Sequence, residues 1–170
     1  MLTVRKESRQ IRWVTRTALL FALVIVIQML GMPQLVTGPL VNMVLFLATF
    51  LEGMGSGVII GFFTPWVAFS RGILPSPLAP MIPFIMIGNA LLVVVFGIFR
   101  TKPGVTREIA GIVVSALAKY LFLSQSVNFL VGIPGPVAKA MQVPQLVTAL
   151  LGGALAFVLE KFLRRTLRRG

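Results

Sequence analysis

Six long apolar segments, separated by short polar or glycine- and proline-containing connections, run along the chain. With a window of about 19 residues, these segments lie near 14–31, 39–52, 55–70, 82–99, 108–127 and 143–163. Each is close to the roughly 20 residues with which an α-helix crosses a bilayer. The pattern predicts an all-α integral membrane protein, a compact bundle of six transmembrane helices that forms a single membrane domain over residues 1–170. Only "EGMGSG" separates the short second and third segments, so one broken hairpin is the alternative there.

Composition supports a membrane protein and narrows its chemistry. The 170 residues are 57% hydrophobic and 12% charged, with a mean hydropathy of +0.97, which is too apolar for a soluble domain of this length. The absence of cysteine and histidine excludes disulfides and thiolate or imidazole metal sites. No HExxH or GxxxxGK[ST] motif occurs, because "GMGSGVIIG" lacks the lysine. We therefore expect no enzyme, no metal and no cofactor, and uphill transport must draw its energy from a partner or from coupled ions.

Basic residues mark one side of the predicted bundle. All but three of the 16 lie before or at the start of the first segment, between the fourth and the fifth, or at or after the end of the sixth: Arg5, Lys6, Arg9, Arg12, Arg16, Arg100, Lys102, Arg107, Lys161, Arg164, Arg165, Arg168 and Arg169. The positive-inside rule then predicts that both termini are cytoplasmic. Only Arg71, Lys119 and Lys139 remain for the other side or the membrane. Because the net charge of +12 comes from these short clusters, we expect contact with anionic lipid rather than with nucleic acid.

Polar residues within the segments gather in the outer half of the membrane. From the helical rise, Asn89 and Lys119 lie about 10–12 Å below the outer ends of their helices, and Gln28 and Asn42 about 4–5 Å. Polar groups in a bilayer usually face the bundle interior or a cavity. We therefore predict an outward-open substrate-binding pocket formed by Lys119, Asn89, Asn42, Gln28, Trp66 and, at its mouth, Arg71. For Asn89 or Gln28 alone, an interhelical hydrogen bond is the alternative.

Lys119 has no acidic residue at its level. The chain has four acids, and all are expected at cytoplasmic helix ends or turns: Glu7, Glu52, Glu108 and Glu160. The lysine must therefore be deprotonated, extend outward along its stem, meet backbone carbonyls, or receive an anionic or electron-rich group from a ligand. The sequence leaves these four alternatives open.

The outer connections differ from the cytoplasmic ones. They read "GMPQLVTGPL", "SRGILPSPLAPMIP" and "NFLVGIPGPVAKAMQVP", which are rich in proline and glycine and largely apolar. Because proline fixes φ and removes a donor, such segments are stiff and poorly suited to be simple solvated loops. They are expected to be lids over the pocket or re-entrant caps that complete the bundle.

A pair of small residues in the first segment predicts a partner surface. Ala18 and Ala22 in "TRTALLFALVIV" are four residues apart, so they share a helical face on which another helix can approach closely. Gly152 and Ala156 form a second such pair, so the spacing alone is a weak signal.

In its length, six predicted helices, cytoplasmic termini, alanine pair and capping outer loops, the chain resembles the substrate-binding S-component of energy-coupling factor (ECF) vitamin transporters. The resemblance implies high-affinity capture of a vitamin or related micronutrient from outside. It also implies that Ala18 and Ala22 dock a transmembrane T subunit, which carries two cytoplasmic ATPases in a prokaryotic plasma membrane. No ligand contact carries over by motif, so the substrate stays open.

Two other classes of membrane protein remain as alternatives. A small assembly or regulatory subunit needs the helix surfaces but no pocket, and its stability would not respond to a ligand. A secondary transporter or channel needs a path through the cytoplasmic half, which holds almost only apolar residues and glycine.

Overall fold

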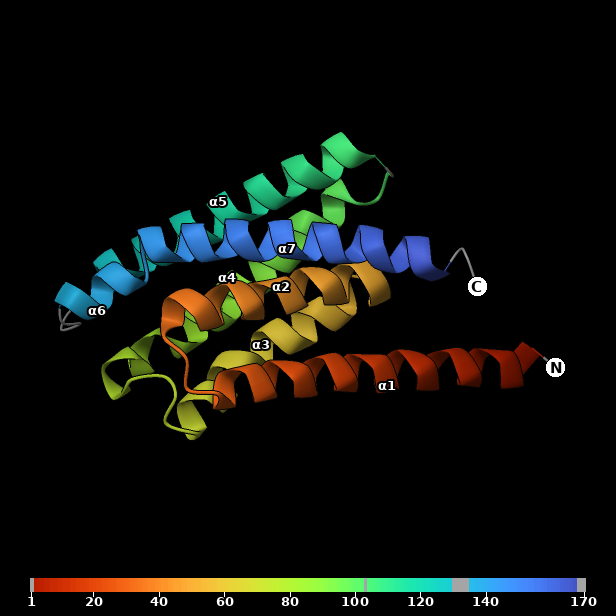
Figure 1. Cartoon of the computed structure of the whole chain (residues 1–170). Coiled ribbons are helices and arrows are strands. Elements are labelled where there is room, and N and C mark those ends of the chain that lie inside the picture. Colours follow the sequence, from red (N-terminus) through yellow and green to blue (C-terminus); the bar gives the residue numbers. More distant parts are fainter. Residues whose placement is uncertain (1, 103, 130–134, 168–170) are drawn as a thin grey trace.

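The computed structural model describes residues 2–102, 104–129 and 135–167. Over these residues the chain is helical without strands, and the predicted all-α fold is confirmed. Two short helical pieces, η1 and α6, lie between the long helices (Figure 1). In chain order the elements are α1 (Leu2–Met29), α2 (Gln34–Glu52), α3 (Met54–Ser70), η1 (Ser76–Met81), α4 (Ile82–Phe99), α5 (Val105–Phe129), α6 (Gly135–Ala140) and α7 (Val143–Leu167).

Within the described ranges, five helical stretches are long and apolar enough to cross a membrane: Glu7–Met29, Gln34–Glu52, Ser76–Phe99, Val105–Phe129 and Ala138–Thr166. The sixth long helix, α3, is apolar but has only 17 residues, which corresponds to about 25 Å against a hydrocarbon core of about 30 Å. Gly53 joins α2 to α3 and adopts a φ of 94°, a conformation that glycine reaches without strain. The second and third predicted helices are therefore two separate helices connected by a very tight turn.

Helix α2 lies in the middle of the bundle and packs against α7, α3 and α1 (Figure 1). Its residues from Val44 to Phe50 are all buried, so this part of the helix is apolar around nearly its whole circumference, as expected for a central helix. Phe46 and Phe50 each contact Phe96 of α4 edge to face, with ring centroids 4.9 Å apart. This core fixes the frame from which the polar residues of α2 and α4 project.

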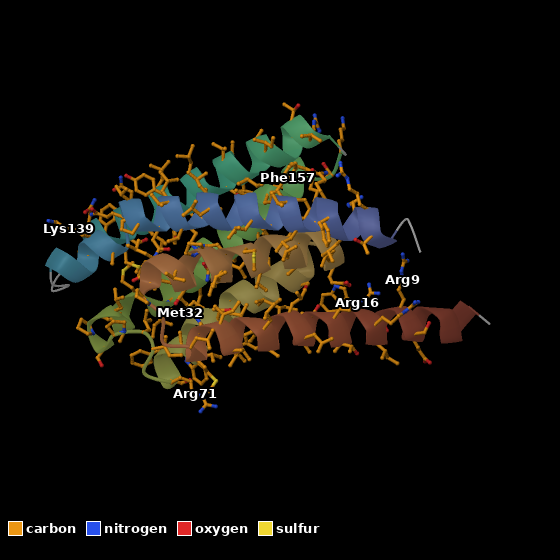
Figure 2. The ribbon with its side chains drawn as sticks, viewed as in Figure 1. Arg9, Arg16, Met32, Arg71, Lys139 and Phe157 are labelled. Atoms are coloured by element: carbon orange, nitrogen blue, oxygen red, sulfur yellow. The ribbon has the colours of Figure 1, made fainter. Side chains whose placement is uncertain are left out.

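The described helix ends that carry the basic residues assigned to one side do lie together. Helix α1 begins and α7 ends at the same end of the bundle, and Figure 2 places Arg9 and Arg16 there, with Arg71 and Lys139 at the opposite end. The end with Arg9 and Arg16 is called the basic end below, and the end with Arg71 and Lys139 is called the pocket end. Among the described residues, the ion pairs lie at the basic end and join Arg16 to Glu52, Lys161 to Glu108 and Glu160, and Arg164 to Glu160.

Helix α1 is attached to the turn between α2 and α3. The indole Nε1 of Trp13 donates to the carbonyl of Glu52 at 3.0 Å, and the hydroxyl of Thr17 donates to that of Ser56 at 2.9 Å. Ala18 and Ala22, by contrast, are exposed on another face of the helix. The two alanines therefore take no part in packing α1 against the bundle.

Candidate substrate-binding site

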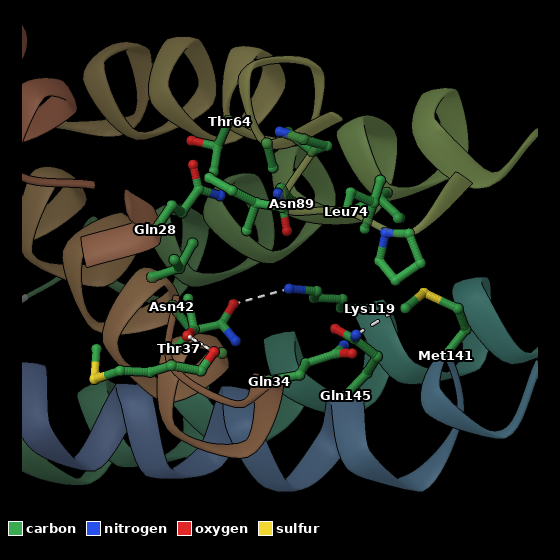
Figure 3. A pocket seen from close by; sticks show the side chains of 18 residues that line it. Gln28, Gln34, Thr37, Asn42, Thr64, Leu74, Asn89, Lys119, Met141 and Gln145 are labelled. Carbon is green, nitrogen blue, oxygen red and sulfur yellow. Dashed lines mark hydrogen bonds between the residues drawn. The ribbon is translucent and has the colours of Figure 1, made fainter. Parts of the chain in front are cut away.

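A cavity with a volume of about 170 Å³ lies at the pocket end, among α1, α2, α3, α4, α5 and α7 (Figure 3). Its polar lining comes from all six of these helices and includes a single charged side chain, Lys119. The apolar lining is aliphatic, with methionine and proline among its members. The polar lining residues are Gln28, Gln34, Thr37, Asn42, Thr64, Asn89, Lys119 and Gln145. The site thus combines a small apolar space with a few converging polar groups, as ligand pockets do.

The structure brings four of the six predicted site residues together at this cavity. Gln28, Asn42, Asn89 and Lys119 line it, and each is less than 10% exposed. They come from α1, α2, α4 and α5, so residues distant in the sequence converge on one space. Their role in substrate binding stays a prediction.

Trp66 and Arg71 lie elsewhere. Trp66 is 59% exposed, and Arg71 is exposed at the end of α3; neither lines the cavity. On α3 the cavity-facing positions are instead Thr64, Pro65 and Ala68. Counting residues along a helix gives the depth of Trp66, but successive residues point about 100° apart, and two steps beyond Thr64 the side chain faces outward.

Lys119 contacts a neutral side chain rather than an acid. Its Nζ donates to Oδ1 of Asn42 at 2.8 Å, and both residues are buried (Figure 3). The amide of Asn42 donates in turn to the hydroxyl of Thr148, with 3.4 Å between Nδ2 and Oγ1. Backbone carbonyls are among the groups that the sequence allows Lys119 to meet, whereas the structure supplies the side-chain carbonyl of Asn42.

The depth expected for Asn42 was wrong. Helix α2 begins at Gln34, and Pro39, where the sequence suggests a helix start, lies inside it. Asn42 is therefore eight residues into the helix, about 12 Å along its axis. Asn42 therefore lies at the level of Lys119. The predicted helix began at residue 39 and placed Asn42 closer to the helix end.

Asn89 makes the interhelical hydrogen bond that the sequence analysis considered for it. Its Nδ2 donates to the backbone carbonyl of Gly61 at 3.0 Å. Helices α3 and α4 are close at this point, because a Cβ added to Gly61 would lie 3.0 Å from the Cβ of Asn89. The contact uses the amide nitrogen only, so it leaves the carbonyl oxygen of Asn89 available at the cavity.

Gln28 and Gln145 complete the polar lining in different ways. Oε1 of Gln28 is buried and accepts no hydrogen bond from the described residues. Gln145 instead donates from Nε2 to the backbone carbonyl of Ala140 at 3.4 Å. Gln145 is not among the predicted site residues, although its place as a polar residue in the first turn of an apolar helix was the available signal.

The second small-residue pair has a structural role at the site. Gly152 and Ala156 are buried where α7 packs on α2, and a Cβ on Gly152 would lie 2.6 Å from the carbonyl oxygen of Pro39 and 2.7 Å from Cβ of Asn42. The two helix backbones therefore touch beside Asn42. This close approach holds Asn42 in reach of Lys119 and Thr148.

Replacing Gly152 with alanine is expected to lower both stability and ligand affinity. Alanine improves helix propensity by about 1 kcal/mol, but here it meets backbone atoms that cannot move aside, and overpacking typically costs about 1–3 kcal/mol. Thermal melting and ligand titration in detergent measure the two effects. Gly55→Ala is the control, since its Cβ meets only Trp13 at an ordinary 3.5 Å; equal effects of the two substitutions would contradict this account.

The outer segments border the cavity and also cap it. Met32, Met141 and the connection Ile73–Leu74–Pro75 line the cavity. Beyond it, Leu78 and Met81 of η1 form a second apolar cluster with Leu123, Val127 and Met141. Residues 130–134 of the third outer connection lie outside the described residues. Both expectations for these segments, lid and cap, fit this arrangement, and ligand-dependent movement stays a prediction.

Comparison with protein families gives one match. Residues 12–163, most of the chain, match the family described as ECF transporter, substrate-specific component. The matched range contains all the cavity residues described above and both alanines of α1. No curated protein and no solved structure matches the chain.

Proposed function

Because the chain belongs to the family of ECF transporter substrate-specific components, we propose that it captures a vitamin or related micronutrient with high affinity outside the cell. Members of this family partner with T and ATPase subunits and with a small-molecule substrate. In the proposal, a T subunit with two cytoplasmic ATPases supplies the energy, and the chain acts as one membrane domain in a prokaryotic plasma membrane. The basic end then faces the cytoplasm and the pocket end faces outward.

The observation that carries the proposal is the environment of Lys119. Its ammonium lies in a cavity within the bundle, 3% exposed, and its hydrogen-bond partner among the described residues is the neutral amide of Asn42. An ammonium group has three hydrogens, so two remain for another acceptor. Charged groups at this depth are costly and usually serve a ligand or ion path. A bound substrate with a carboxylate, or a comparably polar acceptor, would supply the missing partner.

The filled core below the cavity favours capture by this subunit over transport through it. The core between the cavity and the basic end contains three fully buried side chains, Leu45, Phe46 and Phe96. The two phenylalanine rings pack edge to face. A secondary transporter or channel would need a polar path here. Helix α1, whose exposed face carries Ala18 and Ala22, offers a surface on which a separate T subunit can pack.

The test is recovery of the substrate from the purified protein. Wild-type protein isolated in mild detergent is expected to release a small molecule on denaturation, detected by mass spectrometry. Lys119→Met should carry much less of it, whereas Lys139→Met, which removes an exposed lysine at the same end, should carry as much as wild type. If all three preparations are equally empty, or equally loaded, the cavity is not the capture site.

A further inference from the structure

Three of the amide side chains around the cavity have orientations fixed by hydrogen bonds. Nδ2 of Asn89 and Nε2 of Gln145 both face backbone carbonyls, which can only accept hydrogen bonds. Oδ1 of Asn42 faces the ammonium of Lys119, which can only donate. The oxygen and nitrogen of these three amides therefore cannot be exchanged without losing a hydrogen bond.

This arrangement leaves acceptors without donors. Oδ1 of Asn89 and Oε1 of Gln145 accept no hydrogen bond within the described part of the chain, and the same holds for the buried Oε1 of Gln28. Figure 3 shows the Asn89 oxygen directed toward the space beside Lys119. Of the three oxygens only that of Gln28 is fully buried, where an unpaired polar group costs free energy; the other two remain accessible. A ligand that supplies N–H or O–H groups would satisfy these oxygens.

Unpaired polar groups surround the cavity instead of lying on one side. Gln28 projects from α1, Asn89 from α4 and Gln145 from α7, while the donor Lys119 projects from α5. A ligand that pairs with these groups must carry polar atoms on several sides of its skeleton.

The apolar part of the lining favours an aliphatic ligand over a flat heteroaromatic one. None of the described side chains that line the cavity is aromatic; Met32, Val41, Ile85, Leu74 and Met141 are typical members. Residues 130–134, which lie outside the described part, read Leu-Val-Gly-Ile-Pro and contribute no ring either. A flat heteroaromatic ligand would find no ring on which to stack. The volume of about 170 Å³ is close to the roughly 150 Å³ that accommodates benzene in an engineered cavity, so the bound group must be compact.

We infer that the substrate is a compact aliphatic carboxylic acid that carries amide N–H or hydroxyl groups. Its carboxylate binds Lys119, its N–H or O–H groups bind the free oxygens of Asn89 and Gln145, and a further polar group pairs with the amide of Gln28. This inference rests on the proposed function and specifies the chemistry of the molecule captured.

Three small acids of similar size test the inference on the wild-type protein. N-acetyl-β-alanine has a carboxylate and an amide N–H on an aliphatic chain. In 5-oxohexanoate, a methylene replaces that N–H and the rest is unchanged. Nicotinate carries its carboxylate on a flat heteroaromatic ring. Each is titrated at millimolar concentration against protein freed of copurified ligand, with thermal melting as the readout.

N-acetyl-β-alanine is expected to bind about tenfold more tightly than 5-oxohexanoate, because one hydrogen bond to an otherwise unpaired acceptor distinguishes them. It should also bind more tightly than nicotinate, and Lys119→Met should weaken it at least tenfold while Lys139→Met does not. Equal binding of the amide and the ketone, or preference for nicotinate, would overturn the inference. So would the failure of all three acids to bind; a small molecule recovered from the purified protein would then still support the proposed function by itself.

Discussion

Replacing Ala18 or Ala22 with tryptophan is expected to abolish substrate uptake in cells while leaving the affinity for substrate nearly unchanged. Both alanines are exposed on α1, whereas the buried positions of the same helix include Thr17, Val24 and Gln28. A large ring on the exposed face prevents the close backbone approach that small residues permit between membrane helices. It does not disturb the cavity, because neither alanine lines it. Uptake of labelled substrate and binding to purified protein measure the two quantities separately.

The matched control is Ala154→Trp. Ala154 is likewise exposed, but it lies on α7, away from the α1 face. Transport should persist in this variant, and copurification of the T subunit should be lost only in the α1 variants. If Ala18→Trp transports normally, or if Ala154→Trp fails equally, the docking surface is not on α1.

The second large effect concerns Lys119. Substituting methionine is expected to weaken substrate binding by about 1.5–3 kcal/mol, or roughly ten- to a hundredfold, the range for a hydrogen bond that involves a charged group. The stability of the empty protein should change little, because two effects oppose each other. An ammonium is removed from the membrane interior, but Oδ1 of Asn42 loses its donor.

A double substitution separates binding from folding. Asn42→Ala alone leaves the ammonium of Lys119 without a described partner and should lower the melting temperature of the empty protein more than Lys119→Met does. The combined variant removes both members of the pair, so its melting temperature should recover while binding stays weak. Should binding recover together with stability, Lys119 acts only as a structural partner of Asn42.

The helices could be predicted from the sequence because the bilayer requires long apolar runs, and all six long helices lie where those runs are. The start of α2 was missed because Pro39 reads as a boundary, whereas the helix begins five residues earlier and continues through this proline. The short helices η1 and α6 have no such length signal; η1 reads Ser-Pro-Leu-Ala-Pro-Met and gives no apolar period.

The site was only partly predictable because depth and direction are different quantities. Depth along a helix follows from residue number, and it placed Gln28, Asn89 and Lys119 in the outer half. Direction depends on how the helices pack, so Trp66 faces away while Thr64 and Gln145 line the cavity. The two pairs of small residues show the same difference between spacing and direction. Both have a spacing of four residues, but Ala18 and Ala22 are exposed on α1, whereas Gly152 and Ala156 are buried on α7.

The central position of α2 has a consequence for how such a protein can change its specificity during evolution. The segment Val44–Phe50, which belongs to the core of the bundle, does not line the cavity, whereas Gln28 and Gln145 do. Exchanging a side chain that faces a cavity removes few packing contacts, so the cost in stability is small. New ligand preferences can therefore arise at these positions while the frame is conserved. Asn42 and Gly152 are the exceptions, because each belongs to the frame and the lining at once, and they are expected to change last.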